Sequence, residues 1–160
     1  MANHNPYTPG TTITDPAMFF GRKAEVAELS ETIRKGGCKA VVGLRRIGKS
    51  SLLYHVAHHA THPDHVVVVY LDLLNGRYHT VSGLLSGILT GLQAATNHRY
   101  PIPATPDMSS FTTIIEQMKA DGYQAAVCLD ELERLMNHPL FWTATTYLNN
   151  AKKSVQTAAN

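Results

Sequence analysis

Charge, cysteine and long apolar runs are all scarce in this chain. Only 16% of its 160 residues are charged and the formal net charge is +2, so nothing points to a nucleic-acid or anionic-membrane partner. Its longest apolar run, residues 66–71, is far shorter than the ~20 residues that span a bilayer. The N-terminus lacks the basic start and apolar core of a signal peptide. These absences lead us to expect a cytoplasmic protein without membrane or nucleic-acid partners.

The two cysteines, Cys38 and Cys128, fall in or beside segments that we predict to be buried strands. Buried free thiols of a reducing compartment are therefore a better interpretation than a disulfide. Apolar residues make up 44% of the chain, and its length suits a single domain with a real core.

The sequence Gly43-Leu-Arg-Arg-Ile-Gly48-Lys49-Ser50 fits the phosphate-loop pattern G-x-x-x-x-G-K-[ST]. Glycine lets such a loop bend tightly with its N–H groups turned inward, and the following helix adds the positive end of its dipole. Lys49 can then reach the β and γ phosphates of a nucleotide, and Ser50 can bind Mg²⁺. Residues 39–43 read as a short buried strand into the loop and residues 51–57 as a helix out of it, which is the required context. The alternative is a glycine-rich turn that carries a stray lysine.

Five small or apolar residues, 125–129, lead to Asp130 and Glu131. Such a run suits a parallel strand covered on both faces, and acids at its C-terminal end lie where open α/β sheets bind ligands. We expect Asp130 to hold Mg²⁺, directly or through water, and Glu131 to orient and deprotonate the attacking water. A helix that starts with two acids explains the same residues equally well when they are read alone.

Strands and helices alternate along the chain, which predicts a three-layer α/β fold with a mostly parallel sheet. Residues 1–18 read as an extended arm, because proline and glycine interrupt them. In residues 19–160 we predict strands at 39–43, 65–73 and 125–130 and helices at 22–35, 51–57, 82–96 and 139–150. A further helix begins at an N-cap formed by Ser109 or Ser110 and ends at Asp121.

Two repeated spacings suggest other roles. The helix that follows the phosphate loop carries four histidines at metal-ligand spacing, on the face opposite its apolar residues: His55, His58, His59 and His62. A solvated polar face is the favoured interpretation and a zinc or nickel site the alternative.

The second spacing is a smooth ridge on the helix 82–96, formed by Gly83, Gly87 and Gly91. Close packing of this helix on the sheet is the favoured interpretation, and a self-association face is the alternative.

Four segments of the chain together carry a family pattern. They are Asn5-Pro-Tyr7, Asp15-Pro-Ala-Met-Phe-Phe-Gly-Arg22, Gly43-Leu-Arg-Arg-Ile-Gly-Lys-Ser-Ser-Leu-Leu-Tyr54 and Leu129-Asp-Glu-Leu-Glu-Arg134. In these segments the chain resembles the nucleotide-binding domain of STAND ATPases, relatives of AAA+ proteins in prokaryotic signalling and defence. The resemblance covers roughly residues 5–159. It implies a P-loop NTPase fold, ATP and Mg²⁺ as ligands, and a switch between ADP-bound and ATP-bound states.

The resemblance also places Phe20, Gly21 and Arg22 beside the base and ribose. The full set of predicted nucleotide-binding residues is Phe20, Gly21, Arg22, Gly43, Arg46, Ile47, Gly48, Lys49, Ser50 and Ser51. The predicted metal ligands are Ser50 and Asp130, and the predicted catalytic residues are Glu131 and Lys49.

In this family a later strand lies between the phosphate-loop strand and the Asp-Glu strand, and a helical lid and an effector domain follow. The candidate for that strand is residues 154–159, and the lid and effector are absent. We therefore expect a C-terminally incomplete fold whose open edge self-associates or is covered by a lid or effector region.

The leading functional expectation is an ATP-binding, slowly hydrolysing regulatory switch domain. One alternative is a nucleotide-dependent interaction module without useful hydrolysis. Another is a P-loop kinase for a small molecule, for which the loop 97–110 supplies one arginine, Arg99. The preference for ATP over GTP comes from the resemblance.

Overall fold

The computed structural model describes residues 10–136 of the chain, a mixed α/β structure. Its elements, in order, are η1 (Pro16–Met18), α1 (Lys23–Arg34), α2 (Lys49–His58), β1 (Val66–Asp72), η2 (Gly76–His79), α3 (Val81–Ala95), α4 (Met108–Ala120), β2 (Gln124–Asp130) and α5 (Glu133–Met136). The helices and the two later strands predicted within these residues are confirmed to within a few residues. The predicted helix 139–150 and strand 154–159 lie outside the described residues.

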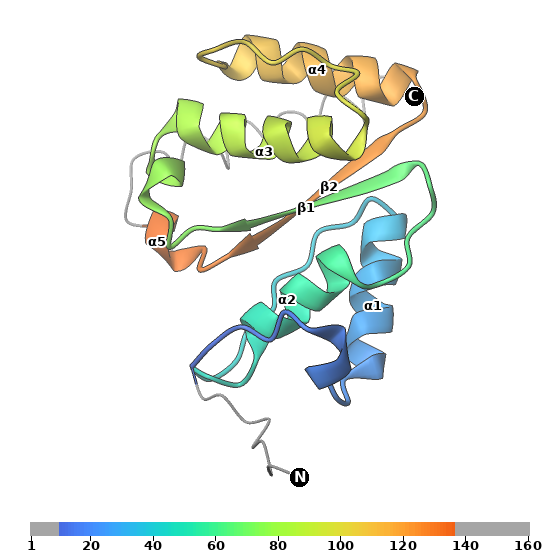
Figure 1. The fold of residues 1–160 in the computed structure, drawn as a ribbon, viewed down its shortest axis with the longest axis vertical. Coiled ribbons are helices and arrows are strands. Elements are labelled where there is room, and N and C mark those ends of the chain that lie inside the picture. Colours follow the sequence, from blue (N-terminus) through green and yellow to red (C-terminus); the bar gives the residue numbers. More distant parts are fainter. Residues whose placement is uncertain (1–9, 137–160) are drawn as a thin grey trace, which may run out of the picture.

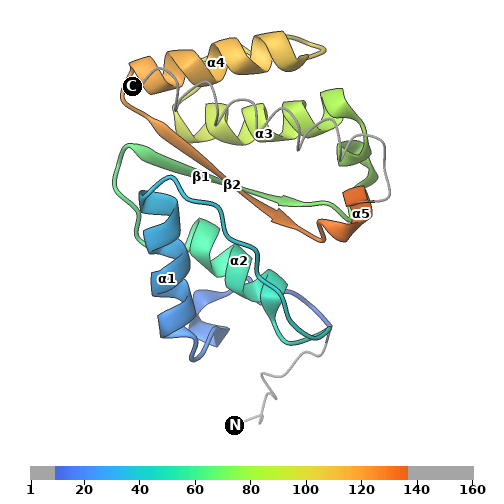
Figure 2. The same cartoon turned by 180° about the vertical axis from the view of Figure 1, so that it is seen from behind.

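The described sheet has two parallel strands, β1 and β2, paired in register from Val66 opposite Gln124 to Asp72 opposite Asp130. The connection between them runs through α3 and α4, as a parallel pair requires. Helices α1 and α2 lie against one face of the sheet and α3 and α4 against the other (Figures 1 and 2). Both strands therefore end at the same edge, each with an aspartate.

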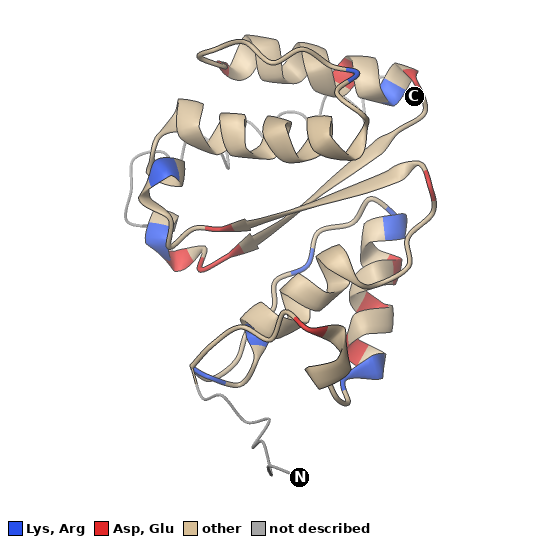
Figure 3. Cartoon of the chain, in the orientation of Figure 1, with Lys and Arg blue, Asp and Glu red and all other residues tan. Residues whose placement is uncertain are grey.

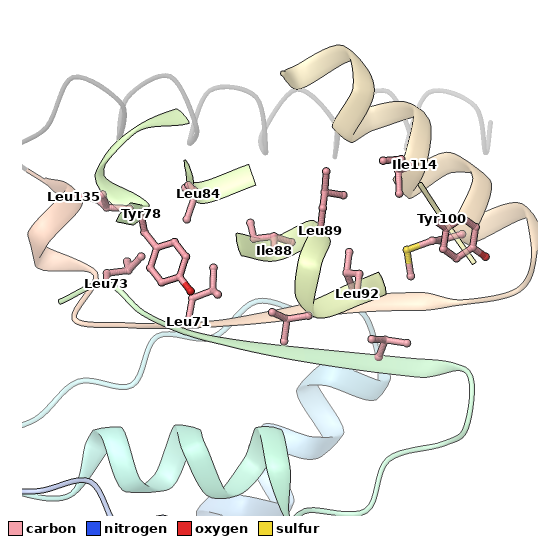
Figure 4. Close-up of a cluster of buried hydrophobic side chains, with 13 residues drawn as sticks. Leu71, Leu73, Tyr78, Leu84, Ile88, Leu89, Leu92, Tyr100, Ile114 and Leu135 are labelled. Carbon is pink, nitrogen blue, oxygen red and sulfur yellow. The ribbon is translucent and has the colours of Figure 1, made fainter. Parts of the chain in front are cut away.

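The larger core lies between the sheet and helices α3 and α4 (Figure 4). Its fully buried members include Leu73, Leu89, Leu92 and Met118. Alternate residues of β1 point into this core, while the other face of the strand meets α2, so the strand is apolar almost throughout. A smaller cluster, Leu29, Leu52 and Val56, joins α1 to α2.

Helix α4 begins two or three residues earlier than the sequence suggested. Its N-cap is Asp107, whose carboxylate accepts a hydrogen bond from the Ser110 N–H at 2.8 Å. The Ser110 hydroxyl in turn accepts one from the Asp107 N–H, which completes a capping box. Ser110 is therefore the third helical residue rather than the cap, and the predicted serine N-cap is wrong because a carboxylate competes better for the free N–H groups.

The predicted buried strand at residues 39–43 is also wrong. Within residues 10–136 this segment pairs with no strand, because β1 and β2 hydrogen-bond to each other and not to it. Val41 packs against the smaller cluster, whereas Val42 is 86% exposed. Its neighbour Cys38 is exposed as well, so the expectation of two buried thiols holds for Cys128 alone. An apolar segment forms a strand only where a neighbouring strand can accept and donate its backbone hydrogen bonds.

The three glycines of α3 are required by close packing, as the favoured interpretation predicted. A Cβ atom at Gly83 would lie 1.8 Å from the Arg77 carbonyl oxygen, and one at Gly91 would lie 2.6 Å from Val69 Cγ1. A Cβ at Gly87 would lie 2.4 Å from the ring of Tyr78. This face of α3 lies against the chain's own η2 and β1, which favours close packing over the self-association alternative.

We expect Gly83→Ala to lower the free energy of unfolding by about 1–3 kcal/mol, the usual cost of overpacking, because a backbone oxygen occupies the space. The gain in helix propensity, about 1 kcal/mol, offsets only part of this. Gly76→Ala is the matched control, since a Cβ there meets nothing within 4 Å. Urea unfolding of both variants measures the difference, and equal stabilities would show that η2 moves aside without cost.

Candidate functional site

The phosphate loop, residues 43–50, turns through two residues with positive φ. Gly48 has φ 84° and is the N-cap of α2, a conformation that glycine adopts without strain. Arg46 has φ 63°, which is unfavourable for a residue with a Cβ. The loop is an exposed surface, with Leu44 79% exposed and Ile47 49% exposed. The backbone is thus bent tightly between Gly43 and the helix.

Lys49 folds back onto this loop. Its Nζ donates hydrogen bonds to the carbonyl oxygens of Gly43 at 3.1 Å and Leu44 at 3.0 Å. Both bonds are exposed to solvent, so their net contribution to stability is small. The ammonium group is therefore held at the mouth of the loop by weak contacts that an anion could replace.

The N-terminus of α2 is free to bind an anion. Gly48 offers no side-chain cap and the first turn contains no acidic residue, so nothing described competes for its N–H groups. Ser50 is the second residue of this turn. The basic segment of the loop lies on the same side of the molecule as the acidic ends of β1 and β2 (Figure 3).

Asp130 lies at the end of β2 and is buried, with 7% of its surface exposed. Its Oδ1 accepts a hydrogen bond from the Glu131 N–H at 3.0 Å and its Oδ2 accepts one from the Tyr70 hydroxyl at 2.8 Å. Burial and the nearby carboxylate raise the pKa of Tyr70, so its hydroxyl stays protonated and acts as the donor. Among the side chains that the structure describes, no Lys, Arg or His pairs with Asp130.

A buried carboxylate without a cationic partner fits a metal ion, because burial of an uncompensated charge is costly. Hydroxyl and carboxylate oxygens suit Mg²⁺, which binds through one or two carboxylates and completes its shell with water and phosphate oxygens. Ser50 and Asp130 offer that donor set. A site built from protein ligands alone is not formed, since residues 10–136 hold no group of three His, Cys, Asp or Glu suited to a metal ion.

Glu131 adjoins Asp130 and has φ 55°, a second strained position in the site. Burial, a hydrogen bond with the Glu133 carboxyl and the charges of Glu133 and Asp130 raise its pKa. The pKa of Glu133 is lowered, first by a hydrogen bond with its own backbone N–H and further by Glu131, Lys49 and Arg134. The Glu133 carboxyl therefore holds its negative charge more readily than the Glu131 carboxyl, and the positive charge of Lys49 contributes to this difference.

The segment predicted to meet the base and ribose lies beside the phosphate loop. The Arg22 guanidinium donates a hydrogen bond from Nη1 to the Gly48 carbonyl at 3.2 Å, and its Nε lies 3.7 Å from Glu25. Arg22 itself has φ 55°. Phe20 is 76% exposed, so its ring is free to stack on a planar ligand.

The histidines of α2 meet the N-terminal arm rather than solvent alone. His55 stacks on Phe19 with 4.0 Å between ring centroids, and a ring nitrogen of His59 lies 2.9 Å from the Thr14 carbonyl oxygen. The Ile13 N–H donates to the Ser51 hydroxyl at 2.9 Å. The predicted solvated face is thus confirmed for His58 and His59, which are exposed, and corrected for His55 and His62, which are half-buried. The arm from residue 10 onward is not simply extended, because it includes the short helix η1. The Ser51 hydroxyl is already engaged by the arm.

Acidification should loosen this contact. Burial, followed by the charge of His59, lowers the pKa of His55 below its usual 6.5. The unfolded chain then binds the proton more tightly, so the stabilisation is complete above about pH 6.5 and is lost as the pH falls toward the lowered pKa. We expect the melting temperature to decrease between pH 7 and 5, with a smaller decrease in His55→Phe.

The matched control is His65→Phe, because His65 is exposed ahead of β1. This variant should keep the pH dependence of the wild type. If the melting temperatures of the wild type and His55→Phe decreased equally with pH, the acid sensitivity would belong to other groups.

Sequence reasoning missed two residues of the site. Glu133 had a visible signal, since it follows Glu131 at a spacing of two and precedes a basic residue. Tyr70 had none until the register of the strands was known. In the structure Glu133 interacts with Glu131 and senses the charge of Lys49, and the Tyr70 hydroxyl donates to Asp130.

No protein-family model, curated protein or solved structure matches this chain. No helix of the described part is long and apolar enough to cross a membrane. Two hollows, of about 390 and 370 Å³, lie away from the phosphate loop, one against α4 and one between β1 and α3. Interpretation of the site therefore rests on its own residues.

Proposed function

We propose that this chain binds ATP with Mg²⁺ at the phosphate loop and hydrolyses it slowly, as the switch domain of a STAND-like signalling or defence protein. The observation that carries the proposal is that two features lie on the same side of the molecule. One is a glycine loop with an uncapped helix N-terminus and Lys49; the other is the buried Asp130 with Glu131 beside it, and the charge of Lys49 reaches Glu133. The P-loop NTPase fold, with a three-layer arrangement, is part of this proposal.

Each residue has a role that its surroundings support. Lys49 exchanges its two carbonyl partners for the β and γ phosphate oxygens, which form stronger, charge-assisted hydrogen bonds. The N–H groups of the loop and of the first turn of α2 bind the remaining phosphate oxygens. Mg²⁺ held by Ser50 and Asp130 would supply the positive charge that phosphoryl transfer requires.

Glu131 is the residue placed to accept a proton from the attacking water. Its raised pKa makes it a stronger base once it is deprotonated, but leaves less of it deprotonated at neutral pH. Arg22, through its contact with Gly48, links the ribose side of the site to the end of the loop.

A second candidate has one observation in its favour. Burial and the neighbouring Glu133 carboxyl raise the pKa of Glu131, and a protonated glutamate cannot act as a base. If that state dominates, the chain is a nucleotide-dependent interaction module without useful hydrolysis. The kinase alternative gains no comparable support. It needs Arg99 at the phosphates, but Arg99 pairs with Asp121 at 3.4 Å, and Asp121 precedes the N-terminal end of β2, whereas Asp130 lies at the other end.

Isothermal titration of the chain with ATP, ADP and GTP, with and without Mg²⁺, tests the proposal. We expect ATP and ADP to bind and Mg²⁺ to tighten the binding of ATP. Steady-state phosphate release then separates the switch domain from the interaction module. A folded chain that binds no nucleotide at millimolar concentration would contradict both.

A further inference from the structure

The hydroxyl of Tyr70 is aimed at the carboxylate of Asp130. Tyr70 pairs with Cys128 in the sheet register, and Asp130 lies two residues further along β2. Side chains two residues apart on a strand share a face, so Tyr70 and Asp130 both project from the face of the sheet on which α2 lies. The hydroxyl donates to Oδ2 at 2.8 Å, across a sequence separation of 60 residues.

The ring of Tyr70 is held in place by α2. The ring of Tyr54 meets it edge-on with 5.4 Å between centroids, and the ring of His58 lies 5.9 Å away. Both contacts come from the helix that begins at the phosphate loop. The donor on Tyr70 therefore has one orientation, fixed by the same helix that would bind the phosphates.

Asp130 has two oxygen atoms and receives one donor on each. The Glu131 N–H fixes Oδ1 and the Tyr70 hydroxyl fixes Oδ2, so the carboxylate cannot rotate. Each oxygen keeps a further lone pair for a ligand. Donors of this kind beside a metal ligand typically change metal affinity by about 10–100-fold, because they orient the ligand before the metal arrives.

We infer that Tyr70 is a positioning residue for the Mg²⁺·ATP site, where it orients the Asp130 carboxylate toward the metal. The inference rests on the proposed function. Tyr70 lies on a strand, outside both sequence motifs. In this role it controls the affinity for Mg²⁺ and leaves the affinity for ATP without Mg²⁺ unchanged.

The test compares Tyr70→Phe with the wild type in ATP titrations performed in EDTA and across a range of Mg²⁺ concentrations. Tyr70→Phe removes one oxygen atom and keeps the ring contacts. We expect equal ATP affinity in EDTA and about 10-fold more Mg²⁺ for half-maximal tightening of ATP binding. Tyr54→Phe is the matched control, since Tyr54 belongs to the same aromatic group and does not touch Asp130; it should behave as the wild type.

A double-mutant cycle with Asp130→Asn separates positioning from a general structural effect. If Tyr70 acts through Asp130, its loss adds little once that carboxylate is gone. Additive effects, or an unchanged Mg²⁺ requirement in Tyr70→Phe, would overturn the inference while ATP binding still upholds the proposed function. A wild type that binds no ATP would overturn both. Thermal melts of each variant confirm that binding is compared between folded proteins.

Discussion

Replacing Lys49 by alanine is expected to weaken ATP binding about 100-fold or more while the domain stays folded. The ammonium group of Lys49 carries a full positive charge, and its two exposed carbonyl contacts can be exchanged for phosphate oxygens. Charge-assisted hydrogen bonds to phosphate contribute about 1.5–3 kcal/mol each, and every 1.4 kcal/mol is a factor of ten in affinity. Both contacts of Lys49 are exposed, so the stability should change by no more than about 0.5 kcal/mol.

ATP titration together with circular dichroism measures both parts of this expectation. Lys39→Ala is the matched control, because Lys39 lies just ahead of the loop and pairs with Glu28 on α1. It removes the same charge from the same region without touching the site. A folded Lys49→Ala chain that retains micromolar binding would remove Lys49 from the site, and equal losses in both variants would point to the general charge of the region.

The part of the site that could be predicted from sequence is the part that depends on local spacing. A phosphate loop is a continuous segment, so Gly48, Lys49 and the helix that follows them can be identified without knowing the fold. β1 and β2 were found because a buried parallel strand is apolar on both faces. Each of these signals is contained in about ten consecutive residues.

The features that sequence missed depend on distant partners. The contact of Tyr70 with Asp130 requires the register of two strands separated by more than 50 residues. Residues 39–43 looked like a strand because they are apolar, but a strand needs a neighbour, and residues 10–136 supply none for them. The role of the three glycines of α3 became clear from Arg77, Tyr78 and Val69, which pack against them only in the folded chain.

Glu131→Gln should preserve the binding of Mg²⁺·ATP and lower the hydrolysis rate at least ~100-fold, the usual contribution of a positioned general base. Glutamine keeps the shape of the side chain and cannot accept the proton from water. Phosphate release at saturating ATP measures the rate, and ATP titration confirms that binding is intact. An unchanged rate would assign the base elsewhere, and a wild type without turnover would favour the interaction module.

Glu133→Gln distinguishes the two glutamates, because it removes the acid that raises the pKa of Glu131. In the wild type the rate should increase as the pH rises through that raised pKa, since only deprotonated Glu131 accepts a proton. In Glu133→Gln the pKa of Glu131 falls, so the increase should occur at lower pH and activity near neutrality should be kept or enhanced. Loss of activity in Glu133→Gln together with an active Glu131→Gln would exchange the roles of the two residues.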